Sequence, residues 1–151
     1  MKQFGSFEDI LDYAIKEEEA AAAFYTDLAN KMDRPAMREA FEGFAREEQG
    51  HKEILLRVKA GGVAGFGSAQ VADLKIGDFL VDVEPSADMD YQQALVLAMK
   101  KEKAAFRMYS ELAEVAEDAS LKETLRNLAQ EEAKHKLRFE VEYDEEVLRE
   151  N

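Results

Sequence analysis

The sequence contains two histidines, and each of them follows a glutamate by three residues. Glu48 and His51 lie in the segment Glu-Glu-Gln-Gly-His, and Glu132 and His135 lie in Glu-Glu-Ala-Lys-His, 84 residues later. On an α-helix, residues i and i+3 lie on the same face. The sequence therefore predicts two helices that each present a carboxylate and an imidazole on one face, and we expect the rest of the chain to bring these two faces together.

The first half of the chain predicts a hairpin of two helices, at about 7–32 and 35–60. Both stretches have apolar residues at alternating steps of three and four, the spacing of a helix face that packs in a core. The connection between them is short, which favours antiparallel neighbours. The predicted face of the first helix consists of Leu11, Ala14, Glu18, Ala21, Tyr25, Leu28 and Met32, and that of the second consists of Met37, Phe41, Phe44, Glu48, His51, Leu55 and Val58.

Glu18 is the middle one of three consecutive glutamates. Its neighbours Glu17 and Glu19 lie about 100° to either side on a helix, away from the apolar face. The same argument separates Glu48, on the face of the second helix, from Glu47. The spacing thus selects one glutamate from each acidic run as a buried carboxylate.

The second half repeats the first at the 84-residue offset without an insertion, and predicts helices at about 90–117 and 121–148. The first of these has a cap at Asp90 with Gln93 three residues later, and the second has a Ser-x-x-Glu capping box that starts at Ser120. The predicted faces consist of Leu95, Ala98, Glu102, Ala105, Tyr109, Leu112 and Ala116, and of Leu121, Leu125, Leu128, Glu132, His135 and Phe139.

Residues 61–89 connect the two hairpins. The segment begins with Gly61 and Gly62, but it also carries apolar residues that are too numerous for a solvated linker, so we expect it to pack against the helices. It is long enough to cross a helix bundle and to make the third helix parallel to the second. We therefore predict one all-α domain over residues 1–151, a ferritin-like four-helix bundle with a long crossover between helices two and three. The apolar residues of the segment are Phe66, Val71, Leu74, Ile76, Phe79, Leu80, Val81 and Val83.

Composition excludes several classes of function. The chain has 33 acidic and 20 basic residues, and its net charge of −13 argues against nucleic acid as a partner. It has no cysteine, which excludes disulfides, iron–sulfur clusters and Cys-ligated metals. No stretch approaches the ~20 apolar residues of a membrane span, and the first residues do not resemble a signal peptide. We expect a soluble cytoplasmic protein that does not associate with membranes.

All four predicted helix faces carry glutamate at matching depth. Buried together, these carboxylates would repel one another and take up protons unless cations neutralised them. Two divalent metal ions would balance four formal negative charges, and the donor set suits iron, manganese or zinc. The predicted ligands are Glu18, Glu48, His51, Glu102, Glu132 and His135.

This pattern resembles the ferritin-like di-iron carboxylate superfamily, and within it the rubrerythrin-like branch, over nearly the whole chain. The resemblance implies two iron ions, with Glu48 and Glu132 as bridging ligands, Glu18 and Glu102 as terminal ligands, and one histidine on each metal. Tyr25 and Tyr109, two turns after the single glutamates, are similar to tyrosines that hydrogen-bond to the ligands of such sites. Packing in the core would explain these two tyrosines equally well.

The resemblance implies two alternative activities. The first is a peroxidase or oxidase that reacts its di-ferrous centre with peroxide or oxygen; the second is a ferroxidase that binds and stores iron. The rubredoxin-type domain of rubrerythrins is lacking, so electrons must come from an external donor. Rubrerythrins also carry an extra carboxylate about one turn after the third-helix ligand, where this chain has Ala105. That difference makes the site more similar to the ferroxidase centre of bacterioferritin. The resemblance also implies a homodimer.

Overall fold

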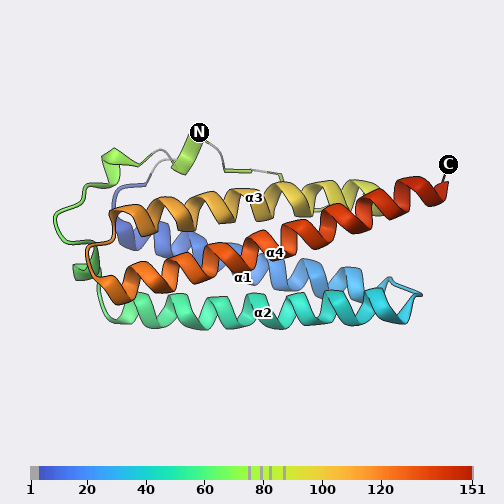
Figure 1. Cartoon of the computed structure of the whole chain (residues 1–151), viewed down its shortest axis with the longest axis horizontal. Helices are drawn as coiled ribbons and strands as arrows, with labels where there is room; N and C mark the ends of the chain where they lie inside the picture. Colours follow the sequence, from blue (N-terminus) through green and yellow to red (C-terminus); the bar gives the residue numbers. More distant parts are fainter. Residues whose placement is uncertain (1–3, 75, 79, 82, 87, 151) are drawn as a thin grey trace. The chain divides into compact units, whose positions relative to one another are not determined.

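The computed structural model describes residues 4–74, 76–78, 80–81, 83–86 and 88–150. Within these ranges it contains α-helices and short 3-10 helices and no strand. The long helices are α1 (Phe7–Asn30), α2 (Pro35–Ala60), α3 (Tyr91–Val115) and α4 (Ala119–Glu150), and the 3-10 helices are η1 (Ala64–Phe66), η2 (Val71–Asp73) and η3 (Ile76–Asp78) (Figure 1).

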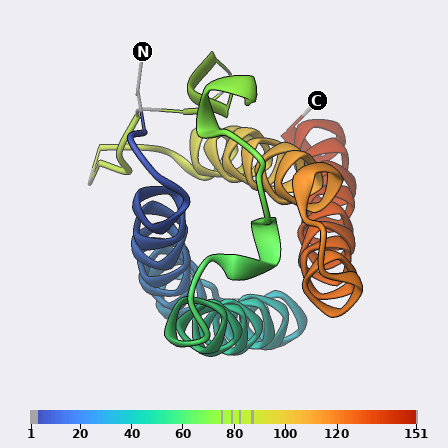
Figure 2. The ribbon, with the colours of Figure 1, turned by 90° about the vertical axis from the view of Figure 1, so that its left-hand side faces the viewer.

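Helices α1 and α2 form a hairpin in the first of two compact units, residues 4–64 (Figure 2). The predicted cap of α1 is confirmed, because the Ser6 hydroxyl accepts a hydrogen bond from the Asp9 N–H at 3.1 Å. The helix ends at Asn30, two residues earlier than predicted, where the Lys31 N–H bonds to the Leu28 carbonyl at 3.1 Å and tightens the last turn. Pro35 is the first residue of α2, where its missing N–H costs no hydrogen bond.

The buried face of α1 differs from the prediction at Ala21 and at Met32, which is half-buried and lies beyond the end of the helix. Ala22 is 3% exposed, whereas Ala21, the predicted member of the face, is half-buried. A straight helix turns every 3.6 residues, so a face drawn at strict steps of three and four drifts away from the true core side. Helix α3 departs from the prediction in the opposite direction, since Ala104 is buried and the predicted Ala105 is half-buried, so this drift does not explain the difference there.

Helices α3 and α4 form the second hairpin, within residues 65–150. The capping box of α3 is confirmed, since Asp90 accepts from the Gln93 N–H at 2.8 Å and Gln93 accepts from the Asp90 N–H at 2.9 Å. The predicted box at Ser120 is wrong. Helix α4 begins earlier, at Ala119, because the Asp118 carboxylate accepts from the Leu121 N–H at 2.8 Å and thereby caps the first turn.

The segment before α3 packs against the second hairpin. The Gly65 carbonyl accepts from the Glu117 N–H at 2.8 Å and from the Asp118 N–H at 3.0 Å, and the Lys101 ammonium donates to the Val81 carbonyl at 3.0 Å. Phe66 and Ile76 are buried, as its apolar composition predicts, but Val83 is 53% exposed; Phe79 lies outside the described residues. Gly67 has φ +58°, and any Cβ there would collide with the Glu117 side chain.

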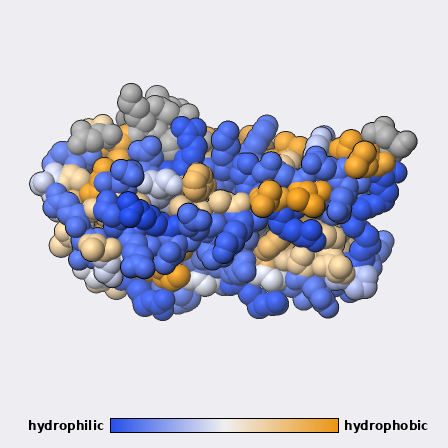
Figure 3. Space-filling model, in the orientation of Figure 1, coloured by the Kyte–Doolittle hydropathy of each residue, from blue (hydrophilic) through white to orange (hydrophobic). Residues whose placement is uncertain are grey.

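The face of the molecule drawn in Figure 3 is mostly hydrophilic, with separate hydrophobic patches. This agrees with the net charge of −13. Among the described residues, no helix combines the length and the hydropathy that crossing a bilayer requires.

Candidate metal centre

The first hairpin buries three of the predicted ligands: Glu18 on α1, and Glu48 with His51 on α2. Their exposed fractions are 3%, 1% and 6%. The adjacent Glu19 and Glu47 are exposed, as their positions off the apolar faces predict. Helix periodicity therefore selected the buried glutamate in both runs.

The three side chains of the first hairpin converge on one another. The His51 Nδ1 atom lies 3.3 Å from Glu48 Oε1 and 3.4 Å from Glu18 Oε2. One ligand atom from each of the three lies within 4.8 Å of the others, which is close enough for them to bind one cation together. Two carboxylates and one imidazole form a donor set that suits a divalent transition metal.

Electrostatics around His51 favour a positive charge. Burial by itself lowers the pKa of His51, but the hydrogen bonds and the negative charges of Glu18 and Glu48 outweigh that effect and raise this pKa to about 10. Without metal, a proton on the imidazole balances one of the two negative charges of Glu18 and Glu48 at neutral pH. A metal ion at the same place would have to displace that proton, because only neutral imidazole binds metal.

The second hairpin repeats this arrangement with Glu102 on α3, and Glu132 with His135 on α4. Their side chains are 2%, 1% and 1% exposed. The His135 Nδ1 atom lies 3.5 Å from Glu102 Oε2, and one ligand atom from each of the three lies within 4.8 Å of the others. Each hairpin thus provides a buried cluster of two carboxylates and one histidine, as the internal repeat predicts.

The two tyrosines predicted near the ligands are both in the core. Tyr25 is 1% exposed and Tyr109 is 0% exposed. The Tyr25 ring packs against Phe24 and Phe44, with ring centroids 5.7 Å and 6.2 Å apart. Core packing accounts for this burial, and a hydrogen bond from either hydroxyl to a metal ligand stays a prediction.

One buried acidic residue was missed by the sequence analysis. Glu142 is 0% exposed, and the Tyr91 hydroxyl donates a hydrogen bond to its Oε2 atom at 2.6 Å. Glu142 continues the buried face of α4 three residues beyond Phe139, so extending that face by one more step would have found it.

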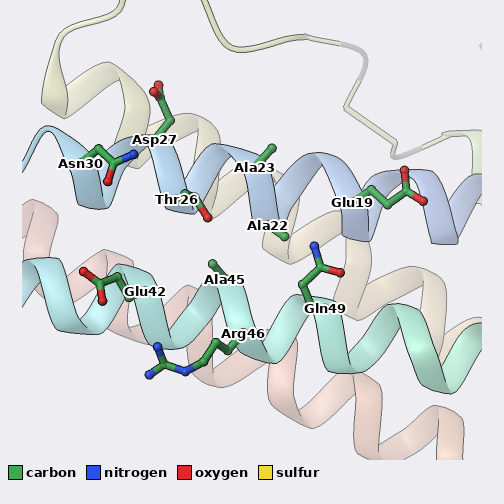
Figure 4. A pocket seen from close by; sticks show the side chains of 10 residues that line it. All are labelled: Glu19, Ala22, Ala23, Thr26, Asp27, Asn30, Glu42, Ala45, Arg46 and Gln49. Carbon is green, nitrogen blue, oxygen red and sulfur yellow. The ribbon is translucent and has the colours of Figure 1, made fainter.

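A groove on the first hairpin is separate from these clusters. It lies between α1 and α2 and encloses about 560 Å³ (Figure 4). Alanines and charged or polar side chains line it: Glu19, Ala22, Ala23, Thr26, Asp27, Asn30, Glu42, Ala45, Arg46 and Gln49. None of the six predicted ligands lines this groove.

A comparison with models of protein families is consistent with the four long helices and with the buried glutamates and histidines described above. The family model described as Rubrerythrin matches residues 9–143. The chain belongs to the rubrerythrin family. Rubrerythrin membership and the four long helices confirm the predicted class, an all-α ferritin-like four-helix bundle. In a rubrerythrin, the buried glutamates and histidines indicate a metal-binding site of the di-iron type. We found no significant match among curated proteins or among solved structures.

Proposed function

We propose that this rubrerythrin-family protein binds two iron ions through all six predicted ligands, and that it oxidises the di-ferrous pair with peroxide or oxygen. One observation carries the proposal: each hairpin buries two glutamates and one histidine, with ligand atoms within 4.8 Å of one another. The family match supports iron as the metal. The six residues are Glu18, Glu48, His51, Glu102, Glu132 and His135.

The cost of burying these charges supports bound cations. In the described chain, the buried charged or titratable side chains other than tyrosine are all glutamates or histidines, with no lysine or arginine among them. Buried carboxylates are strongly unfavourable unless they are paired or coordinate metals. Two divalent ions would neutralise the four carboxylates of the clusters. Manganese or zinc would suit the same donors, so the choice of iron depends on the family.

Each residue has a proposed task. With iron bound, Glu48 and Glu132 would be the ligands shared by the two metals, Glu18 and Glu102 would each serve one metal, and each neutral histidine would serve one metal. Bound iron would supply the electrons that reduce the oxidant. The surrounding apolar side chains exclude bulk water, and an external donor restores the electrons because the chain has no cysteine for a second iron centre.

A ferroxidase that takes up and stores iron is the second candidate, and one residue favours it. Ala105 is found where rubrerythrins carry an extra carboxylate, about one turn after Glu102. Without that carboxylate, each hairpin provides the same set of ligands, two glutamates and one histidine. In this alternative function, iron is a substrate that leaves the site after oxidation.

Stopped-flow absorbance of the anaerobic di-ferrous protein, mixed separately with peroxide and with oxygen, distinguishes the two candidates. The peroxidase reading predicts much faster oxidation by peroxide, saturation at two irons per chain, and repeated turnover only with an added reductase system. Continued oxidation of excess ferrous iron under oxygen would instead establish the ferroxidase. Absence of bound iron after loading would contradict both.

A further inference from the structure

Tyr91 and Glu142 form a buried polar pair that takes no part in the proposed metal centre. Tyr91 is the first residue of α3 and is half-buried, whereas Glu142 on α4 is completely buried. The hydroxyl-to-carboxylate distance of 2.6 Å is in the range of a charge-assisted O–H···O⁻ bond. The proton of Tyr91 therefore has an acceptor inside the protein.

The internal repeat shows that a hairpin of this kind does not require the pair. At the 84-residue offset, Tyr91 corresponds to Phe7 and Glu142 corresponds to Val58. The first hairpin thus forms with an apolar residue at both positions, and Phe7 is buried there. Burying a carboxylate costs free energy, whereas burying a valine side chain does not. The second hairpin therefore carries a polar pair that is costly to bury, at positions where apolar residues are sufficient in the first hairpin.

Glu142 is near one ligand cluster but separated from it. It follows His135 by seven residues on the same face of α4, a distance of about 10 Å along the helix axis. Phe139, 0% exposed, fills the turn between them. This spacing is too long for Glu142 to bind a metal ion held by His135.

We propose that Tyr91 and Glu142 form a redox-active tyrosine–carboxylate pair. When a one-electron oxidant removes an electron from the Tyr91 phenol, the O–H bond breaks and its proton moves to Glu142. A neutral tyrosyl radical and a protonated carboxyl group result. A one-electron donor then reduces the radical, the proton returns to the Tyr91 oxygen, and no proton is exchanged with solvent over the cycle.

The biological role of the pair depends on the proposed function. In a di-iron oxidoreductase without cysteine or tryptophan, tyrosine is the most readily oxidised side chain, and it is therefore the side chain suited to relay electrons from an external donor. Half-buried Tyr91 is accessible to such a donor and lies in the hairpin that carries His135. The redox property itself requires no metal, so it can be tested separately from iron binding.

The test uses the full-length chain, freed of metal by a chelator, with its helix content checked by circular dichroism. Photogenerated ruthenium(III) tris-bipyridine oxidises the protein, and electron paramagnetic resonance of frozen samples measures the tyrosyl radical. Tyr91→Phe should lose most of the signal and should fold, because Phe7 occupies the matched position. Tyr143→Phe, which removes a neighbouring tyrosine on α4, should retain the signal.

Glu142→Gln tests the proton transfer. Glutamine keeps a hydrogen-bond acceptor but cannot take up the proton, so the radical yield should fall at pH 7 and recover at alkaline pH, where hydroxide accepts it. Equal yields in the wild type and in Tyr91→Phe would overturn the proposal. An unchanged yield in Glu142→Gln at pH 7 would overturn it too. Neither result would bear on iron binding, which metal analysis measures independently.

Discussion

Neighbouring glutamates in this protein differ completely in environment. Glu48 is 1% exposed and lies 3.3 Å from His51, whereas Glu47 points to solvent. A rotation of 100° per residue is sufficient to separate a proposed ligand from a surface charge. Replacing the buried or the exposed glutamate by alanine makes the same chemical change in two different environments, so the two variants form a matched pair.

Replacement of a buried glutamate should remove bound metal. We expect Glu48→Ala or Glu132→Ala to weaken metal binding by at least about tenfold, since even residues that only support ligands have effects of that order. Glu47→Ala and Glu131→Ala should bind as the wild type does. Metal content per chain, measured after iron loading and desalting, checks this; equal content in all four variants would refute the ligand assignment.

The raised pKa of His51 predicts how the stability of the metal-free protein depends on pH. Folding raises this pKa from 6.5 to about 10, so the folded state binds the proton more tightly. The resulting stabilisation is fully present below pH 6.5 and is lost as the pH rises through about 10. Thermal unfolding of metal-free wild type and His51→Gln between pH 6 and 10 should show the wild type losing stability relative to the variant. Parallel curves would contradict the pairing with Glu18 and Glu48.

At the scale of single elements, the caps decide where the helices begin. Ser6 and Asp90 cap α1 and α3 as their sequence motifs predict. Helix α4 is different, because the Asp118 carboxylate bonds to the Leu121 N–H while the Asp118 N–H bonds to the Gly65 carbonyl. The crossover segment thus holds the residue that starts the last helix.

Asp118→Ala should therefore destabilise the protein by about 1 kcal/mol, the usual cost of losing an N-cap side chain. Ser120→Ala is the matched control and should have little effect, since Ser120 lies inside α4 and not at its cap. Urea unfolding at constant metal content measures both. A larger loss for Ser120→Ala would favour the capping box that the sequence suggests.

For the molecule as a whole, metal binding should couple to folding. Ligands bind metal only when deprotonated, and an ion that binds the folded chain alone stabilises it. We expect the iron- or zinc-loaded protein to melt at a higher temperature than the metal-free protein, and the difference to shrink as acid protonates the glutamates and histidines. Differential scanning calorimetry at several pH values measures this. Equal melting temperatures at pH 7 would argue against two bound metals.

The four helices, most of the buried face of each, and two buried glutamates with one buried histidine in each hairpin could be predicted from the sequence alone, because these depend on helix periodicity and on an internal repeat. Other features depend on partners distant in the chain. Glu142 is hydrogen-bonded to Tyr91, 51 residues away. The pKa of His51 depends on Glu18 from the facing helix. The Gly65 carbonyl holds the backbone N–H of Asp118, the residue that caps α4. Such contacts form only when separate segments pack, so they could not be predicted from the sequence pattern.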